Sequence, residues 1–167
     1  MKFKLTLAVM ALALGLGTSP LVAQAHDDLQ VGNLTIHAPF ARSSARSASS
    51  GAAFLTIKNT GATPDRLVDA RADFAMVQLH VTKVDGNGVA TMQHLSEGIE
   101  IAPGATVTLE PGAMHVMFMG LKQPMLEGET RRVTLVFEKA GAVEIDFPVV
   151  AAGQGGAMMG HGTMQMN

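Results

Sequence analysis

The sequence contains no cysteine, no tryptophan and no tyrosine among its 167 residues. The absence of cysteine excludes disulfide bonds, thiol–disulfide chemistry and thiolate metal sites. It also excludes blue-copper electron carriers, which need a cysteine ligand. The absence of tryptophan and tyrosine argues against functions that use an aromatic platform to stack sugars or bases. No nucleophile–base motif of a hydrolytic enzyme is visible either, so we do not expect an enzyme.

Charge is low, and no long basic block is present. The full chain has a net charge of −2, which becomes −4 if Lys2 and Lys4 leave with an N-terminal leader. A protein that binds nucleic acid normally presents a basic patch or stripe to the phosphates. Nucleic acid is therefore not an expected partner.

No apolar run matches the roughly 20 residues that a membrane-spanning helix needs. The longest run follows Lys2 and Lys4 and ends before the small-residue sequence AQA at 23–25. This order is typical of a cleaved secretory signal peptide. We expect residues 1–25 to be removed, leaving an exported, periplasmic protein that begins near His26 and has no transmembrane segment.

The mature part alternates apolar and polar residues in short segments, and none of them shows a 3.6-residue period. The Ser-rich segment 37–51, which contains Pro39, is expected to be a loop. Together the segments predict one all-β domain, residues 26–150, folded as an antiparallel Greek-key β-sandwich. Strands are expected at 33–36, 52–59, 66–70, 76–84, 89–95, 99–101, 106–109, 115–120, 131–140 and 142–150.

The last segment, 151–167, has too few apolar residues in a regular pattern to bury surface, so it is expected to be a flexible tail. It is rich in methionine and histidine, a composition that binds copper and whose imidazole also suits Cu(II). A candidate secondary copper site in this tail comprises Met158, Met159, His161, Met164 and Met166.

Methionine and histidine are the abundant potential ligands. Ten of the twelve methionines and all six histidines lie after residue 25. Thioether sulfur is the one soft donor available, and together with imidazole it favours Cu(I). In the segment HVMFMG, strand alternation places Val116 and Phe118 on the core face. His115, Met117 and Met119 then lie on the opposite face.

A predicted hairpin around the sequence DGNG carries further ligand candidates. If its loop has three residues, His80 faces His94 directly and Met92 is the diagonal neighbour of His80. A two-residue loop would place Met92 on the opposite face. A metal site therefore requires the odd loop or a bulge, and Gly88 after Asn87 suits a bulged turn.

This register predicts a Cu(I) site formed by His80, Met92, His115 and Met117. Two imidazoles and two thioethers in a roughly tetrahedral arrangement favour Cu(I). All four donors are neutral, so the bound ion keeps a single positive charge. A +1 ion costs less to hold in a half-buried pocket than a +2 ion.

Three stretches of the chain resemble periplasmic copper chaperones of the PCuAC family. They are VGNLTIHAPFAR (31–42), GAAFLTIKNTGATPDRLVDA (51–70) and GVATMQHL through LEGE (88–129). The resemblance implies a cupredoxin-like β-sandwich whose His…Met…His-x-Met pattern makes the same four residues the copper ligands. It also implies a carrier that exchanges copper with periplasmic partners, among them cytochrome oxidase or its assembly factors. We expect the carrier to be a monomer.

Two features depart from the family pattern. Eleven residues separate His80 from Met92, one more than is usual, and Phe40 stands where a tryptophan is common. Met119 is an alternative ligand, and His94 is either a neighbour of the site or solvent-facing. The remaining candidates are assigned no role in binding: His37 as a loop residue, and Met76, Met114 and Met125 as core or rim filling.

Two rival functions remain open. His26, as the N-terminal residue of the processed chain, could chelate Cu(II) through its amine and imidazole, as in oxidative copper enzymes. The lack of tyrosine and tryptophan disfavours that reading, because no aromatic face is available for a polysaccharide. The second rival is a storage or copper-resistance carrier that uses His26 and the tail.

Overall fold

The computed structural model describes residues 28–154, which form eleven β-strands. The expected signal peptide, His26 and the methionine-rich tail lie outside the described residues. Within residues 28–154, no helix has the length and apolar character needed to cross a bilayer. The strands are β1 (Leu29–Val31), β2 (Leu34–Arg42), β3 (Ser50–Asn59), β4 (Asp65–Arg71), β5 (Met76–Val84), β6 (Ala90–His94), β7 (Ile99–Ile101), β8 (Thr106–Leu109), β9 (Met114–Met119), β10 (Thr130–Phe137) and β11 (Gly141–Val150).

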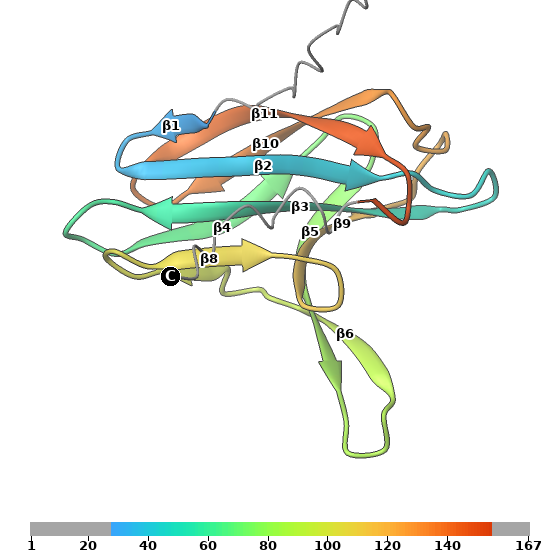
Figure 1. Ribbon diagram of the computed structural model, residues 1–167, viewed down its shortest axis with the longest axis horizontal. Coiled ribbons are helices and arrows are strands. Elements are labelled where there is room, and N and C mark those ends of the chain that lie inside the picture. Colours follow the sequence, from blue (N-terminus) through green and yellow to red (C-terminus); the bar gives the residue numbers. More distant parts are fainter. Residues whose placement is uncertain (1–27, 155–167) are drawn as a thin grey trace, which may run out of the picture.

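The strands follow one hydrogen-bonded path, β6-β5-β9-β3-β2-β11-β10-β4-β7, with β1 added to β2 and β8 to β3 (Figure 1). The path folds over, so that β6, β5, β9, β3 and β2 form one layer and β11, β10, β4 and β7 the other. Strand alternation buries one face of each layer in a shared core. The core includes Ile36, Leu55, Val116 and Phe118 from the first layer and Leu67, Leu135 and Phe147 from the second.

The all-β expectation is confirmed, but one contact is not antiparallel. β11 pairs antiparallel with β10 along its length, and its last two residues pair parallel with β2, Val149 with Ala41 and Val150 with Arg42. The ten-residue β11 is long enough to leave one layer and join the edge of the other. This crossing closes one side of the sandwich.

The expected loop at 37–51 is wrong at both ends, because β2 continues through Pro39 to Arg42 and β3 begins at Ser50. The ladder between β2 and β3 shifts register between His37 and Phe40, and Ala38 has a φ of 45°. Pro39 thus lies in a bulge, where its missing N–H removes no ladder hydrogen bond. His37 is accordingly a strand residue, and its Nδ1 contacts the carboxylate of Asp28.

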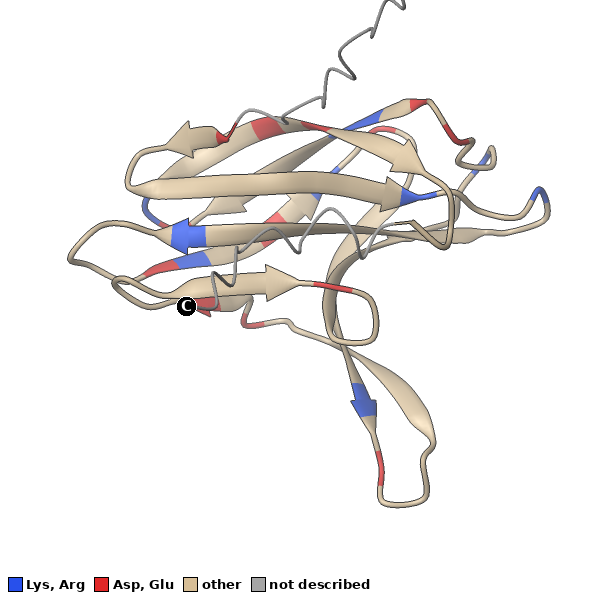
Figure 2. Cartoon of the chain, viewed as in Figure 1, with Lys and Arg blue, Asp and Glu red and all other residues tan. Residues whose placement is uncertain are grey.

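The hairpin of β5 and β6 projects from the body of the sandwich (Figure 1). All five residues of β6 are exposed. Lys83 and Asp85 are the only charged residues between Met76 and Leu95, so most of this arm is uncharged (Figure 2). At the base of the arm, β5 pairs with β9, which places the arm beside the candidate site.

Candidate metal centre

His80 in β5 is the central residue of the candidate site. On one side His80 pairs with His94 of β6, and on the other side with His115 of β9. Met92 pairs with Thr82, and Met117 pairs with Gln78. Both methionines are therefore diagonal neighbours of His80, within reach of a long side chain. The fold brings His80, Met92, His115 and Met117 together on one face of β6, β5 and β9.

The hairpin has the three-residue loop that this arrangement requires. The backbone N–H of Asp85 donates to the carbonyl of Val89 (3.0 Å), which closes the ladder around residues 86–88. The Asp85 carboxylate also accepts from the N–H groups of Asn87 (2.8 Å) and Val89 (2.9 Å). Gly88 has a φ of 81°, a conformation that costs glycine little. The predicted register is confirmed.

The ring of His115 is fixed and buried. Nδ1–H donates to the carbonyl oxygen of Ala113 (3.0 Å), which also accepts from the backbone N–H of Thr82 (3.1 Å). A carbonyl only accepts, so Nδ1 carries the proton and the lone pair is on Nε2. The side chain is 4% exposed and lies beside Phe54, with ring centroids 6.4 Å apart. This is the arrangement of a metal-binding histidine held by a backbone carbonyl.

The ring of His80 leaves the opposite nitrogen free. Nε2–H donates to Oε1 of Gln78 (2.9 Å), which places the lone pair on Nδ1. Nδ1 is buried and has no hydrogen-bond partner among residues 28–154. A buried polar atom without a partner is costly, and a ligand that accepts its lone pair would remove that cost. The centroid of the His80 ring is 6.0 Å from that of His115 and 5.7 Å from that of His94.

The surroundings of His80 also favour its neutral form. Desolvation by burial lowers the pKa of His80 below its ordinary value of 6.5, and repulsion from His115 and His94 lowers it further. Only the neutral imidazole can ligate a metal ion. Burial and the neighbouring imidazoles therefore keep His80 neutral and able to bind a metal ion at neutral pH.

The two thioethers of the site differ in exposure. Met117 is half-buried between Gln78 of β5 and Ala52 of β3. Met92 is 60% exposed on the projecting arm. Met92 is thus the more exposed of the two thioethers, and His115 is the most buried of the four candidate donors.

The other candidates lie at the edge of this set or outside it. His94 is exposed on the outer strand, with its ring facing that of His80. Met119 pairs with Met76 beyond Met117 and is not a cross-strand neighbour of His80. Met114 packs against the core from the opposite face, and Met125 is fully buried. The tail methionines and His161 lie outside the described residues.

Sequence reasoning missed Gln78 and the carbonyl of Ala113, which fix the two rings. Gln78 lies two residues before His80 and so on the same face, a spacing that could have identified it. The role of Ala113 depends on a backbone carbonyl in the turn before β9 and leaves no signal in side-chain types. Phe54 was also missed, because its contact with His115 joins distant segments.

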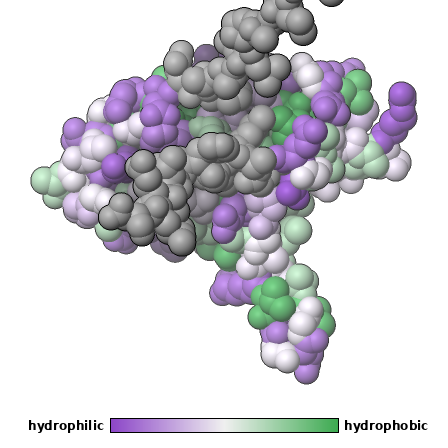
Figure 3. All heavy atoms as spheres, in the orientation of Figure 1, coloured by the Kyte–Doolittle hydropathy of each residue, from purple (hydrophilic) through white to green (hydrophobic). Residues whose placement is uncertain are grey.

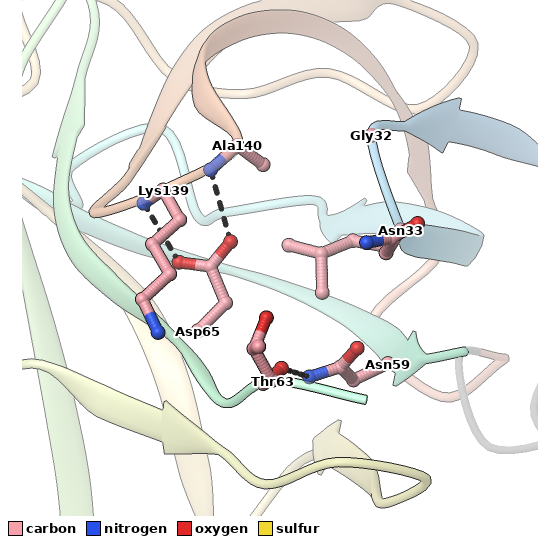
Figure 4. A pocket seen from close by; sticks show the side chains of 8 residues that line it. Gly32, Asn33, Asn59, Thr63, Asp65, Lys139 and Ala140 are labelled. Atoms are coloured by element: carbon pink, nitrogen blue, oxygen red, sulfur yellow. Dashed lines mark hydrogen bonds between the residues drawn. The ribbon is translucent and has the colours of Figure 1, made fainter. Parts of the chain in front are cut away.

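A polar hollow at the far end of β3 offers a second place for a ligand (Figure 4). The Asp65 carboxylate there accepts from the backbone N–H groups of Lys139 (2.9 Å) and Ala140 (3.0 Å). The Asn59 amide donates to the carbonyls of Thr63 (2.8 Å) and Ile101 (3.0 Å). These bonds satisfy the buried groups, so the hollow joins two turns and offers no free donor set.

The described residues hold no group of three or more histidine and carboxylate side chains placed to bind a metal ion. The set around His80 is of a different kind, because sulfur supplies half of its donors. Soft, neutral donors of this type select Cu(I) over harder divalent ions.

Comparison with known proteins shows the family to which the chain belongs. The family described as "Putative lipoprotein LpqE-like" matches residues 34–149. A curated relative, "Putative lipoprotein Lxx21020" from Leifsonia xyli subsp. xyli, is 41% identical over 99 residues, which are 59% of each chain. The chain thus spans little more than half the length of that relative.

Solved structures with the same fold include two that contain copper. One is the copper-bound PCuAC domain from PmoF2, with a TM-score of 0.62 and 30% identity, covering 75% of this chain and 98% of that one. The other is the Cu(I) form of DR1885 from Deinococcus radiodurans, with a TM-score of 0.55 and 28% identity, covering 76% and 83%. The chain belongs to the LpqE-like family, and it shares its fold with the copper-binding PCuAC domains. The lipoprotein descriptions indicate an exported protein of the cell envelope.

The lowered pKa of His80 can be measured by NMR titration of the metal-free protein. We expect a midpoint below 6.5, and a higher midpoint in His94→Gln, because one source of repulsion is lost. The unfolded chain binds more protons than the folded one between the folded-state pKa and 6.5. The contribution of His80 to the free energy of unfolding should therefore be largest above pH 6.5 and should decrease as the pH falls below 6.5.

His37→Gln, a change in β2, is the matched control and should leave the titration of His80 in place. A wild-type His80 midpoint at or above 6.5 would contradict this description of the site.

Proposed function

We propose that this protein is a periplasmic copper chaperone that binds one Cu(I) through His80, Met92, His115 and Met117. The observation that carries the proposal is the position of His80, which has the other three residues as its cross-strand neighbours on one face. The lone pairs left on His80 Nδ1 and His115 Nε2 support it further. No donor needs to lose a proton above the pKa of the histidines, so binding adds one positive charge to the site.

The unequal exposure of the donors suits a carrier better than a permanent cofactor site. His115 and Met117 hold the ion from the sandwich, while Met92 holds it from an exposed arm. A ligand from a partner can replace an exposed thioether without entering the core. The few charges on the arm also keep desolvation costs low when a partner docks there.

The proposed acceptor is a periplasmic copper protein, with the binuclear copper centre of cytochrome oxidase as the specific case. This part of the proposal rests on the likeness to PCuAC proteins. Copper transfer from the Cu(I)-loaded protein to the metal-free acceptor subunit, followed by the acceptor's absorption spectrum after the acceptor has been oxidised, tests it. No transfer to that subunit would remove the oxidase from the proposal and leave the copper site unaffected.

Replacing Met92 and Met117 by leucine tests the ligand set. Leucine has a similar volume and lacks the sulfur, so the fold should be kept and copper binding weakened. We expect the double variant to lose Cu(I) affinity by about tenfold or more in competition with a Cu(I) chelator. Replacing a residue that only orients a metal ligand already costs about tenfold or more in affinity, and replacing ligands should cost at least as much.

Met114→Leu is the matched control, because Met114 lies in the same strand on the opposite face. It should bind Cu(I) as the wild type does. Full affinity in the Met92→Leu/Met117→Leu protein would show that the assignment is wrong.

We also propose that residues 151–167 form a second, weaker copper site that captures copper for the main site. Histidine and backbone groups suit Cu(II), and thioethers suit the reduced ion. Because the tail is covalently joined to the domain, a captured ion would stay near the main site at an effective concentration on the order of millimolar. Deleting residues 153–167 should remove one copper equivalent and slow loading from Cu(II), with the same Cu(I) affinity at the main site. Equal stoichiometry and equal loading rates with and without the tail would refute this role.

A further inference from the structure

The methionines of the described part are not spread evenly over the sandwich. Residues 28–154 contain six methionines, and four of them lie on the face of β6, β5 and β9 that carries His80. The site set described above uses two of these four, Met92 and Met117. The other two, Met76 and Met119, have no part in that set and no place in the core.

Met76 and Met119 form a directly opposed cross-strand pair. Side chains at such positions have Cβ atoms about 4.5–5.5 Å apart. Met117 is the diagonal neighbour of Met76 and lies two residues before Met119 in β9, so it faces both the pair and His80. The register runs without interruption from Met76 to Val81, and no bulge turns one of these side chains away.

The neighbours of this pair leave the thioethers accessible. On β3, the residue opposite Met119 is Ser50 and the residue opposite Met117 is Ala52, and neither is large enough to cover the sulfur atoms. Met76 is 64% exposed, and Met119 is half-buried. A flexible, polarisable side chain at an exposed strand end contributes little to packing, whereas its sulfur is a ligand for Cu(I).

The exposed methionines therefore lie at two ends of the site. Figure 3 shows hydrophobic residues on the projecting arm, where Met92, Val84 and Val89 are exposed. Met76 lies at the other end of the same face of β5, four residues before His80. A thioether route from Met117 to the surface at Met76 would therefore be separate from the exposed thioether of Met92 on the arm.

We propose that Met76 and Met119 form a second Cu(I) contact point, through which copper enters and leaves the main site with Met117 as the shared ligand. The inference rests on the proposed Cu(I) site. During the shift, the bond from copper to Met117 is kept while bonds form to the sulfurs of Met76 and Met119. The bonds to His80, His115 and Met92 break. Every donor is neutral, so no proton moves and copper stays Cu(I).

Methyl NMR of the full mature chain, labelled with ¹³C at the methionine methyl groups, tests the contact directly. Cu(I) is added without oxygen until the spectrum no longer changes. We expect the methyl resonances of Met76 and Met119 to shift in one common step, after those of Met92 and Met117. In Met76→Leu, the Met119 shift in that step should be lost. Unmoved Met76 and Met119 resonances at saturation, or an unchanged Met119 shift in Met76→Leu, would overturn the proposal.

Exchange kinetics test the function of the pair. The rate of Cu(I) transfer to excess bicinchoninate should fall by about tenfold in Met76→Leu/Met119→Leu. This is the lower end of the loss seen when a residue that supports a metal ligand is replaced. The affinity for the first Cu(I) should change far less than the rate. Met114→Leu, on the opposite face of β9, should transfer at the wild-type rate.

A double variant that exchanges copper as fast as the wild type would refute the path. This failure differs from failure of the main site, which appears as unchanged affinity in Met92→Leu/Met117→Leu. The two proposals can therefore be judged separately.

Discussion

The register between β5 and its two neighbours is the constraint on which the candidate site depends. Side chains alternate between the faces of a strand, so a slip of one residue in β6 would move Met92 to the opposite face. The three-residue loop at 86–88, with Gly88 at positive φ, fixes the pairing of His80 with His94. The uninterrupted ladder with β9 fixes the pairing of His80 with His115. The central His80 then has one imidazole directly opposite it on each neighbouring strand, and one thioether diagonal to it on each.

Backbone contacts extend this constraint from positions to ring orientation. The Ala113 carbonyl accepts from both β5 and the His115 ring, so the link that aligns the strands also selects the free nitrogen of the ligand. Gln78 does the same for His80 from within β5. Orienting groups of this kind reduce the rearrangement that metal binding requires. The exposed donor on the arm keeps one side open, which is the property that distinguishes a carrier from a closed site.

The local part of this structure could be predicted from the sequence. Period-two alternation and turn residues located most of the strands. The bulge-prone Asn87–Gly88 pair indicated the loop that places Met92 beside His80. Both signals are short-range, because strand alternation and turn geometry depend on neighbouring residues.

Features set by tertiary contacts could not be predicted in this way. Pro39 indicated a loop, yet the strand passes it through a bulge whose existence depends on the pairing with β3. The parallel contact of Val149 and Val150 with β2 depends on how the two layers close. The orientation of the site rings required the carbonyl of Ala113. The exposure of Met92 required knowing that, among residues 28–154, no strand pairs with the outer side of β6.

The most direct test of the account exchanges two adjacent residues of β6, Met92→Gln with Gln93→Met. The exchange keeps the composition and the number of methionines, and it moves one thioether from the His80 face to the opposite face. The measurement is Cu(I) affinity by chelator competition, with Gln93→Met alone as the control. The account predicts that the exchanged protein binds Cu(I) as weakly as Met92→Leu, while the control binds as the wild type does. Wild-type affinity in the exchanged protein would contradict it, because a thioether on either face would then serve equally well.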